Sequence, residues 1–199
     1  MKIEEIVKKY GKDKDHAYNV AKISVLLFQK LKILFPHLLK YDNKKDLNLL
    51  KNGALLHDIG IFFEKIYDKE HHKAGAKFIL ENKPDDVEDN ELVILCCLIR
   101  YHRKSLPDKK KHKLYALLNK EDKLKLDYLA PIIRLADSLD TGHLNLISDV
   151  NFEYSEKLNI LTLKPKVNIM LNTSILSAVN RKKDFFEKVF KVKLKIKED

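Results

Sequence analysis

Residues 54–60 read ALLHDIG, and in this stretch an apolar helical segment ends in the adjacent pair His57 and Asp58. Apolar residues at helical spacing predict a helix over residues 46–57 that leads into the pair. Gly60 suits a helix C-cap, so we expect the chain to leave the helix there. The pair is then placed at a helix end, where donor atoms from other segments can meet it.

Helical periodicity extends from this stretch in both directions. Apolar residues recur every three or four positions in five segments, which predicts helices over residues 16–34, 46–57 (with Asp46 as a candidate cap), 70–81, 89–101 and 122–140. Pro36 ends the first helix, and Pro131 must kink the last or lie in its first turn.

The pattern changes after the helical region. Residues 150–171 alternate apolar and polar side chains, which predicts two or three strands, and residues 174–190 return to helical spacing. Residues 191–197 predict an edge strand with its lysines outward. We therefore predict a mainly α fold, with a helical domain over residues 1–147. A small α/β C-terminal subdomain follows over residues 148–199, and we interpret it as a packing or dimerisation surface.

Composition favours a cytoplasmic protein. The 199 residues are 45% hydrophobic and 34% charged, as in ordinary globular proteins. No apolar run approaches the roughly 20 residues of a membrane span, and the N-terminal residues lack the apolar stretch of a signal peptide. The adjacent pair Cys96 and Cys97 is a poor disulfide and too small for a zinc cage, so we predict buried reduced thiols.

Positive charge is concentrated between residues 100 and 125. This segment holds ten Lys and Arg against three Asp and Glu, within a chain of formal net charge +10. Such a patch attracts anions, and phosphate-rich ligands are the obvious candidates. The candidate phosphate-binding residues are Arg100, Arg103, Lys104 and Arg134, with Lys109, Lys110 and Lys111 as weaker candidates. The alternative is a solvated lysine-rich loop. Nucleic acid is disfavoured, because aromatic residues do not interleave the lysine run.

His16, His57, Asp58 and Asp137 are the candidate metal ligands, and they come from three predicted helices. Mixed imidazole and carboxylate donors suit Mn, Fe, Co, Ni or Mg rather than structural zinc. A carboxylate inside an apolar helix, such as Asp137, is costly to bury unless it pairs or binds a cation. Arg134 is the alternative partner for it. A metal held by such ligands would lower the pKa of a bound water and neutralise phosphate.

The order His…His-Asp…Asp, centred on HDIG, resembles the HD superfamily of metal-dependent phosphohydrolases. Residues 99–107 (IRYHRKSLP), 134–143 (RLADSLDTGH) and 176–196 (LSAVNRKKDFFEKVFKVKLKI) resemble the C-terminal region of exopolyphosphatase and guanosine pentaphosphate phosphohydrolase (Ppx/GppA) proteins. The resemblance covers nearly the whole chain. It implies an HD-domain helical bundle, one or two divalent ions, and a catalytic role for His57 and Asp58.

Some HD proteins hold two metals, and the resemblance extends to that case. His71 and His102 stand where further histidine ligands are expected, and Asp58 would bridge the two ions. Two alternatives stay open: an exposed helix start for His71, and anion contact beside Arg103 for His102. The lysine that often follows HDIG in two-metal members is replaced by Ile61.

The leading hypothesis is a metal-dependent phosphohydrolase that acts on a nucleotide or another phosphorylated small molecule through a metal-activated water. In the larger proteins that the chain resembles, polyphosphate chemistry belongs to an actin-like N-terminal module that these residues do not contain. We therefore expect the domain to act in its own right, without a membrane partner, as a monomer or a homodimer. The alternative is a non-catalytic module that binds polyphosphate, a nucleotide or RNA. A binder would not need the complete ligand set, which favours the enzyme.

Overall fold

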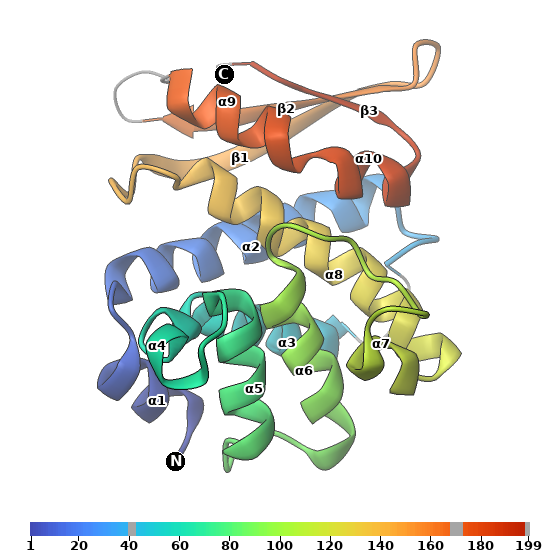
Figure 1. Ribbon diagram of the computed structural model, residues 1–199. Helices are drawn as coiled ribbons and strands as arrows, with labels where there is room; N and C mark the ends of the chain where they lie inside the picture. The colour runs from blue at the N-terminus through green and yellow to red at the C-terminus, as the bar shows by residue number, and fades with distance from the viewer. Residues whose placement is uncertain (40–42, 168–172, 198–199) are drawn as a thin grey trace.

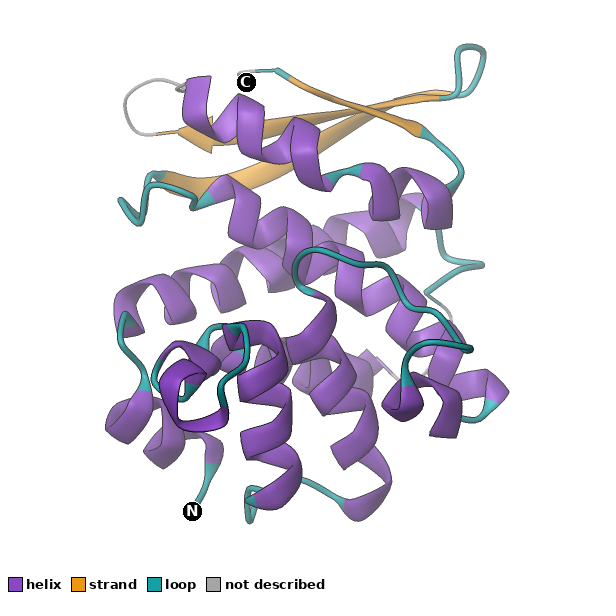
Figure 2. Ribbon diagram, viewed as in Figure 1, coloured by secondary structure: helices purple, strands orange, loops and turns teal. Residues whose placement is uncertain are grey.

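The computed structural model describes residues 1–39, 43–167 and 173–197. Helices form most of the molecule, and a small three-stranded sheet covers one end (Figures 1 and 2). The predicted mainly α fold with a small C-terminal α/β unit is confirmed.

The elements follow the sequence pattern closely. In chain order they are α1 (Ile3–Tyr10), α2 (Lys14–Leu34), α3 (Asn43–Leu56), the 3-10 helix η1 (Ile59–Ile61), α4 (Glu64–Tyr67), α5 (His71–Glu81), α6 (Asp89–Tyr101), α7 (Lys113–Leu117), α8 (Lys120–Leu139), β1 (Ile147–Ser155), β2 (Ile160–Val167), α9 (Thr173–Lys182), α10 (Asp184–Phe190) and β3 (Lys193–Ile196). For the five helices predicted between residues 16 and 140, predicted and observed ends differ by three residues or fewer. The single helix predicted over residues 174–190 is divided into α9 and α10, and helices α1, α4 and α7 were not predicted.

Two of the predicted helix boundaries were wrong. Helix α3 begins at Asn43, so Asp46 lies in its first turn instead of capping it. Gly60 is not a C-cap, because α3 ends at Leu56 and no described glycine has a positive φ. Gly60 lies inside η1, where a Cβ would stand 1.8 Å from the carbonyl oxygen of His71. Glycine is therefore required by the close approach of η1 to α5, and this approach brings Asp58 beside His71.

Helix α8 runs through Pro131 without interruption, so the first-turn alternative for this proline is wrong. The helix begins at a cap in which Asn119 Oδ1 accepts a hydrogen bond from the amide of Asp122, at 2.8 Å. Helix α2 begins in the same way, with Asp13 accepting from the amide of His16 at 2.9 Å. That cap fixes the position of His16 in the first turn of α2.

The C-terminal unit packs against α8. Strands β1 and β2 are antiparallel, β3 adds in parallel at the edge, and α9 and α10 contact α8 (Figure 1). The predicted edge strand is confirmed, with Lys193 and Lys195 exposed and Leu194 buried. Residues 168–171 of the predicted strand region lie outside the described residues.

One hydrophobic core extends from α1 to β3. It includes Leu129 of α8 together with Leu163 and Phe186 of the C-terminal unit. The predicted division between residues 147 and 148 falls just inside β1, and the independence of the C-terminal unit stays a prediction.

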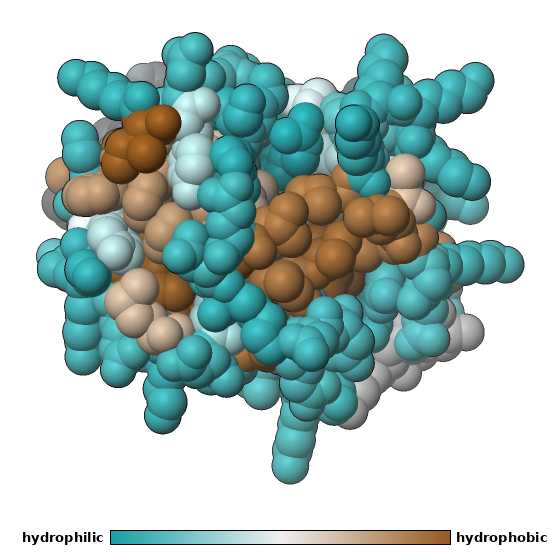
Figure 3. All heavy atoms as spheres, turned by 60° about the horizontal axis from the view of Figure 1, so that its bottom comes forward, coloured by the Kyte–Doolittle hydropathy of each residue, from teal (hydrophilic) through white to brown (hydrophobic). Residues whose placement is uncertain are grey.

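The surface is mixed in character. Figure 3 shows a broad hydrophobic area framed by polar side chains on the face that the lower end of Figure 1 presents. Of the helices in the described parts of the chain, none is both long and apolar enough to cross a membrane.

Cys96 and Cys97 are buried free thiols, and burial raises the pKa of both to about 12.

Candidate metal centre

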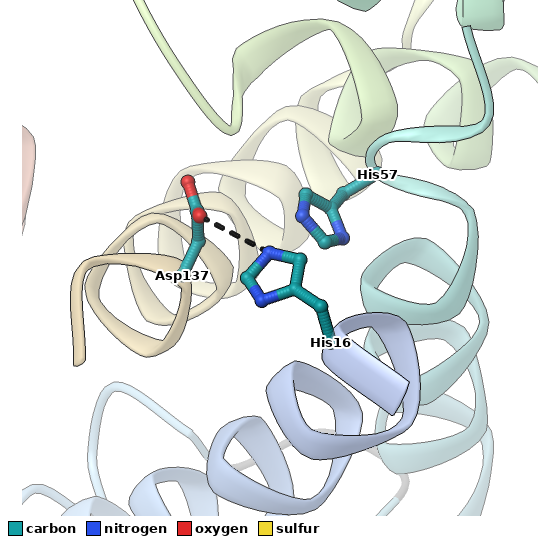
Figure 4. A group of neighbouring side chains, drawn as sticks. All are labelled: His16, His57 and Asp137. Atoms are coloured by element: carbon teal, nitrogen blue, oxygen red, sulfur yellow. Dashed lines mark ion pairs between the residues drawn. The ribbon is translucent and has the colours of Figure 1, made fainter. Parts of the chain in front are cut away.

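Three of the predicted ligands meet in the interior (Figure 4). His16 comes from the first turn of α2, His57 follows the end of α3, and Asp137 lies on α8. One ligand atom from each lies within 4.8 Å of the others. His16 is 2% exposed and His57 is fully buried. The three side chains point into a shared space, with His16 Nε2 at 3.6 Å from Asp137 Oδ1. We call these residues the first group.

A second group of Asp58, His71 and His102 lies beside the first. Asp58 Oδ1 is 3.3 Å from His71 Nε2 and 3.5 Å from His102 Nε2. The other carboxylate oxygen of Asp58 is 3.4 Å from His57 Nε2. Asp58 thus stands between the two groups and presents one oxygen to each.

The four imidazoles share one orientation. In each ring Nδ1 donates a hydrogen bond outward, which leaves Nε2 facing the centre. The acceptors are Asp140 Oδ2 for His16, the carbonyl of Ala54 for His57, Glu64 Oε1 for His71 and the carbonyl of Ile99 for His102, at 2.7, 2.7, 3.1 and 2.7 Å. This is the arrangement in which histidines bind metals through Nε2.

Helix ends create this orientation for two of the rings. His57 directly follows α3, and His102 directly follows α6. The last carbonyls of a helix have no partner within the helix, so each ring can bond to the carbonyl three residues before it. The ordinary chemistry of a helix terminus therefore aims both Nε2 atoms.

Charge around the first group favours ionised side chains. Burial opposes protonation of His16, but the carboxylates of Asp137 and Asp140 outweigh it and raise the pKa of His16 to about 9. At 3.6 Å the contact with Asp137 is too long for a hydrogen bond, so this carboxylate acts mainly through its charge. Burial would raise the pKa of Asp137, but His16 and Lys182 hold it well below its usual value.

In the second group the pKa of His102 shifts in the opposite direction from that of His16. Burial, reinforced by the neighbouring charge of His57, lowers the pKa of His102 to about 3. Burial would raise the pKa of Asp58, yet the surrounding histidines, His57 first, keep that pKa low. A neutral imidazole beside an ionised carboxylate is a combination that binds a cation without first losing a proton.

The predicted phosphate residues are placed differently from one another. Arg103 Nη1 donates to His71 Nε2 at 3.0 Å, so its guanidinium reaches the second group. Lys104 pairs with Glu70, and Arg100 lies beside the ring of Tyr101. The weaker candidates Lys109, Lys110 and Lys111 are exposed on the loop. Of the predicted loop residues, Arg103 is therefore the one that contacts the candidate ligands.

Arg134 does not have the exposed position that the phosphate prediction requires. It is 4% exposed and donates to the carbonyls of Lys182 and Lys104 and to Asp184 Oδ1, at 3.2, 3.0 and 3.2 Å. Nor is it the ion-pair partner of Asp137, the alternative that the sequence left open, because that carboxylate pairs with His16 and Lys182. Arg134 links α8 to the C-terminal unit and to the loop after α6.

Sequence reasoning missed several residues at the centre. Lys182, from α9, forms an ion pair with Asp137. Asp140 orients His16, and its position three residues after Asp137 was a signal that could have identified it. His143 stacks on His16 with the ring centroids 3.8 Å apart. Nothing in the local pattern around Lys182 indicated that the C-terminal unit reaches this centre.

Comparison with known families shows the family of the chain. Residues 1–183 match the family model described as Ppx/GppA phosphatase, domain III. The chain belongs to the Ppx/GppA domain III family. The predicted relation to the C-terminal region of Ppx/GppA proteins is confirmed. Membership of the HD superfamily stays a prediction. The domain III match spans both groups and Lys182. Among curated proteins, the comparison finds no match.

Proposed function

We propose that this domain III chain is an HD-type, metal-dependent phosphohydrolase that acts on a nucleotide or another phosphorylated small molecule. One observation carries the proposal. Nε2 of His16 and Nε2 of His57 are buried without a hydrogen-bond partner among the described residues, beside Asp58 and Asp137. Burying an unpaired polar atom costs about 1–3 kcal/mol. A bound cation would satisfy both nitrogens and both carboxylates.

The donor set fits a divalent ion. His16, His57 and Asp137 would hold one ion, His71 and His102 a second, and Asp58 would contribute to both. Imidazoles with carboxylates suit Mn, Fe, Co or Ni, whereas Mg prefers oxygen ligands and is the weaker candidate here. The outer hydrogen bonds to Nδ1 support this assignment, since they orient the rings in advance.

The side chains around the donors suit phosphate hydrolysis. A divalent ion, when bound, lowers the pKa of a coordinated water and neutralises phosphate oxygens. Asp58 is held ionised, so its carboxylate can accept a hydrogen bond from the attacking water and orient it. Arg103 can donate two parallel hydrogen bonds to a phosphate that enters beside His71. Lys104 follows Arg103 on the loop, and Arg100 lies in the last turn of α6, so both would add positive charge.

A binding module is the competing function. The exposed lysines Lys109, Lys110 and Lys111 would suit polyphosphate or RNA, and the match to domain III of Ppx/GppA phosphatases is compatible with an accessory role. Retention of anions needs only such surface charge. It does not account for four imidazoles that direct Nε2 inward, and this difference favours the enzyme.

Metal analysis of protein purified without chelators tests the proposal. We expect near-stoichiometric Mn, Fe, Co or Ni, and hydrolysis of nucleotides, cyclic dinucleotides or simple phosphate esters. His57→Ala should remove both metal and activity. The matched control is His37→Ala, which removes an exposed histidine and should leave both unchanged.

A chain that contains no metal and stays inert with added Mn would overturn the proposal. Strong retention of polyphosphate or RNA by that inert chain would support the binding module. The cytoplasmic location and a homodimeric state stay predictions from the sequence.

A further inference from the structure

Lys182 brings a positive charge from the C-terminal unit to the first group. It is the last residue of α9, and its Nζ pairs with Asp137 Oδ2. Its carbonyl accepts a hydrogen bond from Arg134 Nε at 3.2 Å, which ties the backbone at this residue to α8. The side chain is 24% exposed, so its ammonium lies at the edge of the buried centre, where solvent can reach it.

The ion pair of Lys182 competes with metal binding by Asp137. In the proposed function Asp137 is a metal ligand, and a divalent ion would bring a second positive charge to the same carboxylate. The two cations repel each other, and the ammonium is carried on a flexible four-carbon stem. It can therefore move to the nearest anion that enters the centre. For a phosphohydrolase that anion is the phosphate of the substrate.

A polar cleft is lined by Arg181, the residue before Lys182. Its volume is about 540 Å³, within the range of small-molecule sites, and its lining is made of Thr141, Gly142, Thr173, Ser174, Ser177 and Arg181. Thr141 and Gly142 directly follow Asp140, which orients His16, and Arg181 directly precedes Lys182. The cleft is thus built from the same two segments that flank the first group. Hydroxyls and a guanidinium are donors for hydroxyl and phosphate oxygens.

We propose that Lys182 contacts the phosphate being hydrolysed and that the cleft lined by Ser177 and Arg181 holds the leaving group. The inference rests on the proposed function. Water forms the new bond to phosphorus and gives up a proton to solvent, and the bond to the leaving oxygen breaks with its electron pair on that oxygen, which takes a proton from solvent. Lys182 offsets the negative charge of the phosphate oxygens. The substrate class is a phosphate ester whose leaving group is polar and bears hydroxyl or anionic groups, such as a nucleoside or sugar.

Binding of inorganic phosphate to the Mn-loaded chain tests the role of Lys182, by calorimetry alongside metal analysis. We expect Lys182→Ala to keep its Mn and to bind phosphate about 10- to 100-fold more weakly, as for the loss of a charged hydrogen bond. Lys182→Arg should restore most of the affinity. Lys195→Ala, which removes a lysine from the exposed face of β3, should bind phosphate like the unaltered chain.

The cleft is tested with the same protein. Arg181→Ala should leave phosphate affinity unchanged and raise KM for a nucleoside monophosphate, with little change in KM for a simple aryl phosphate. Equal rises in KM for both substrates, or none, would overturn the assignment of the cleft.

The outcomes separate the two proposals. Unaltered phosphate binding by Lys182→Ala would mean that Lys182 only neutralises Asp137. This result overturns the inference and leaves the proposed function standing. Loss of Mn from Lys182→Ala would mean that Lys182 positions the metal ligands, and this result also overturns the inference. An unaltered chain that takes up no Mn overturns the proposed function, and the inference with it.

Discussion

Helix α8 carries Asp127 towards its N-terminal end and Asp137 towards its C-terminal end, and the two carboxylates have different surroundings. Around Asp137, a histidine of α2 and a lysine of α9 outweigh burial and lower the pKa of the carboxyl. Around Asp127, burial dominates over the distant charge of Lys188 and raises the pKa to about 6. Two partly buried carboxylates on one helix thus differ in the direction of their pKa shift.

The difference shows where the fold compensates for buried charge. The partners of Asp137 come from segments far away in the sequence, so tertiary structure is arranged to keep this carboxylate ionised. Among the described residues Asp127 has no comparable partners, and its burial is a cost to stability. Keeping a carboxylate ionised in the interior is what the proposed metal site needs, so under the proposed function the C-terminal end of α8 is the functional end.

Asp137→Asn should produce the largest effect, because the amide keeps the size of the side chain but removes its charge. We expect loss of the metal held by the first group and a fall in hydrolysis of at least about 100-fold, beyond the usual effect of residues that only orient a ligand. Metal analysis and steady-state kinetics measure the two losses. Full metal content in this variant would remove the contrast between the two ends of α8.

Arg134→Ala should be the most destabilising change at the C-terminal end of α8. The substitution leaves the carbonyls of Lys104 and Lys182 without their donor and removes the ion pair with Asp184. We expect a loss of about 2–4 kcal/mol in the free energy of unfolding, measured by urea denaturation. Arg181→Ala, which removes an exposed arginine of α9, should change stability by less than about 0.5 kcal/mol. Equal effects would show that the buried link is unimportant.

Most of the fold was predictable because apolar spacing determines which segments form helices. Residues 70–81 and 89–101 were predicted within one residue of α5 and α6. Gly60 was misinterpreted, since a sequence pattern reports a local cap more readily than a contact with another helix. The glycine serves the approach of η1 to α5, which is a tertiary requirement.

The centre was predictable in its residue types and less so in its partners. His16, His57, Asp58, His71, His102 and Asp137 are all brought into two adjoining groups. Their roles as ligands stay a proposal. The partners depend on packing, and so Arg134 was assigned to phosphate although it is buried. Lys182 was missed because its contact with Asp137 joins two segments far apart in the chain.

Asp140→Ala should weaken metal binding without removing a ligand. It deprives His16 Nδ1 of its acceptor, so the ring loses the hydrogen bond that orients Nε2. Loss of such a partner costs roughly 10- to 100-fold in metal affinity, which a competition titration with Mn can measure. Asp140→Asn retains an oxygen acceptor and should lose less. A loss as complete as in Asp137→Asn would instead indicate that Asp140 is itself a ligand.

Asp127→Asn should have the smallest effect. It should stabilise the chain, whereas Arg134→Ala should destabilise it. The folded-state pKa of about 6 lies above the ordinary aspartate value of 3.8, so the folded chain binds more protons between these pH values. The free energy of unfolding therefore falls as the pH rises from about 4 to about 6, and the loss persists above that range. Asn removes the ionisation and should stabilise the chain by about 1–2 kcal/mol at pH 7.5.

The pH dependence of the Asp127→Asn effect identifies its cause. At pH 4 the Asp127 carboxyl is largely protonated in the folded chain, so urea denaturation should find a much smaller gap between the two proteins than at pH 7.5. Glu121→Gln alters an exposed carboxylate on the same helix and should change stability by less than about 1 kcal/mol at either pH. A destabilised Asp127→Asn chain at pH 7.5 would mean that Asp127 has an ionic role after all. The two ends of α8 would then bury charge in the same way, and burial alone would no longer distinguish the functional end.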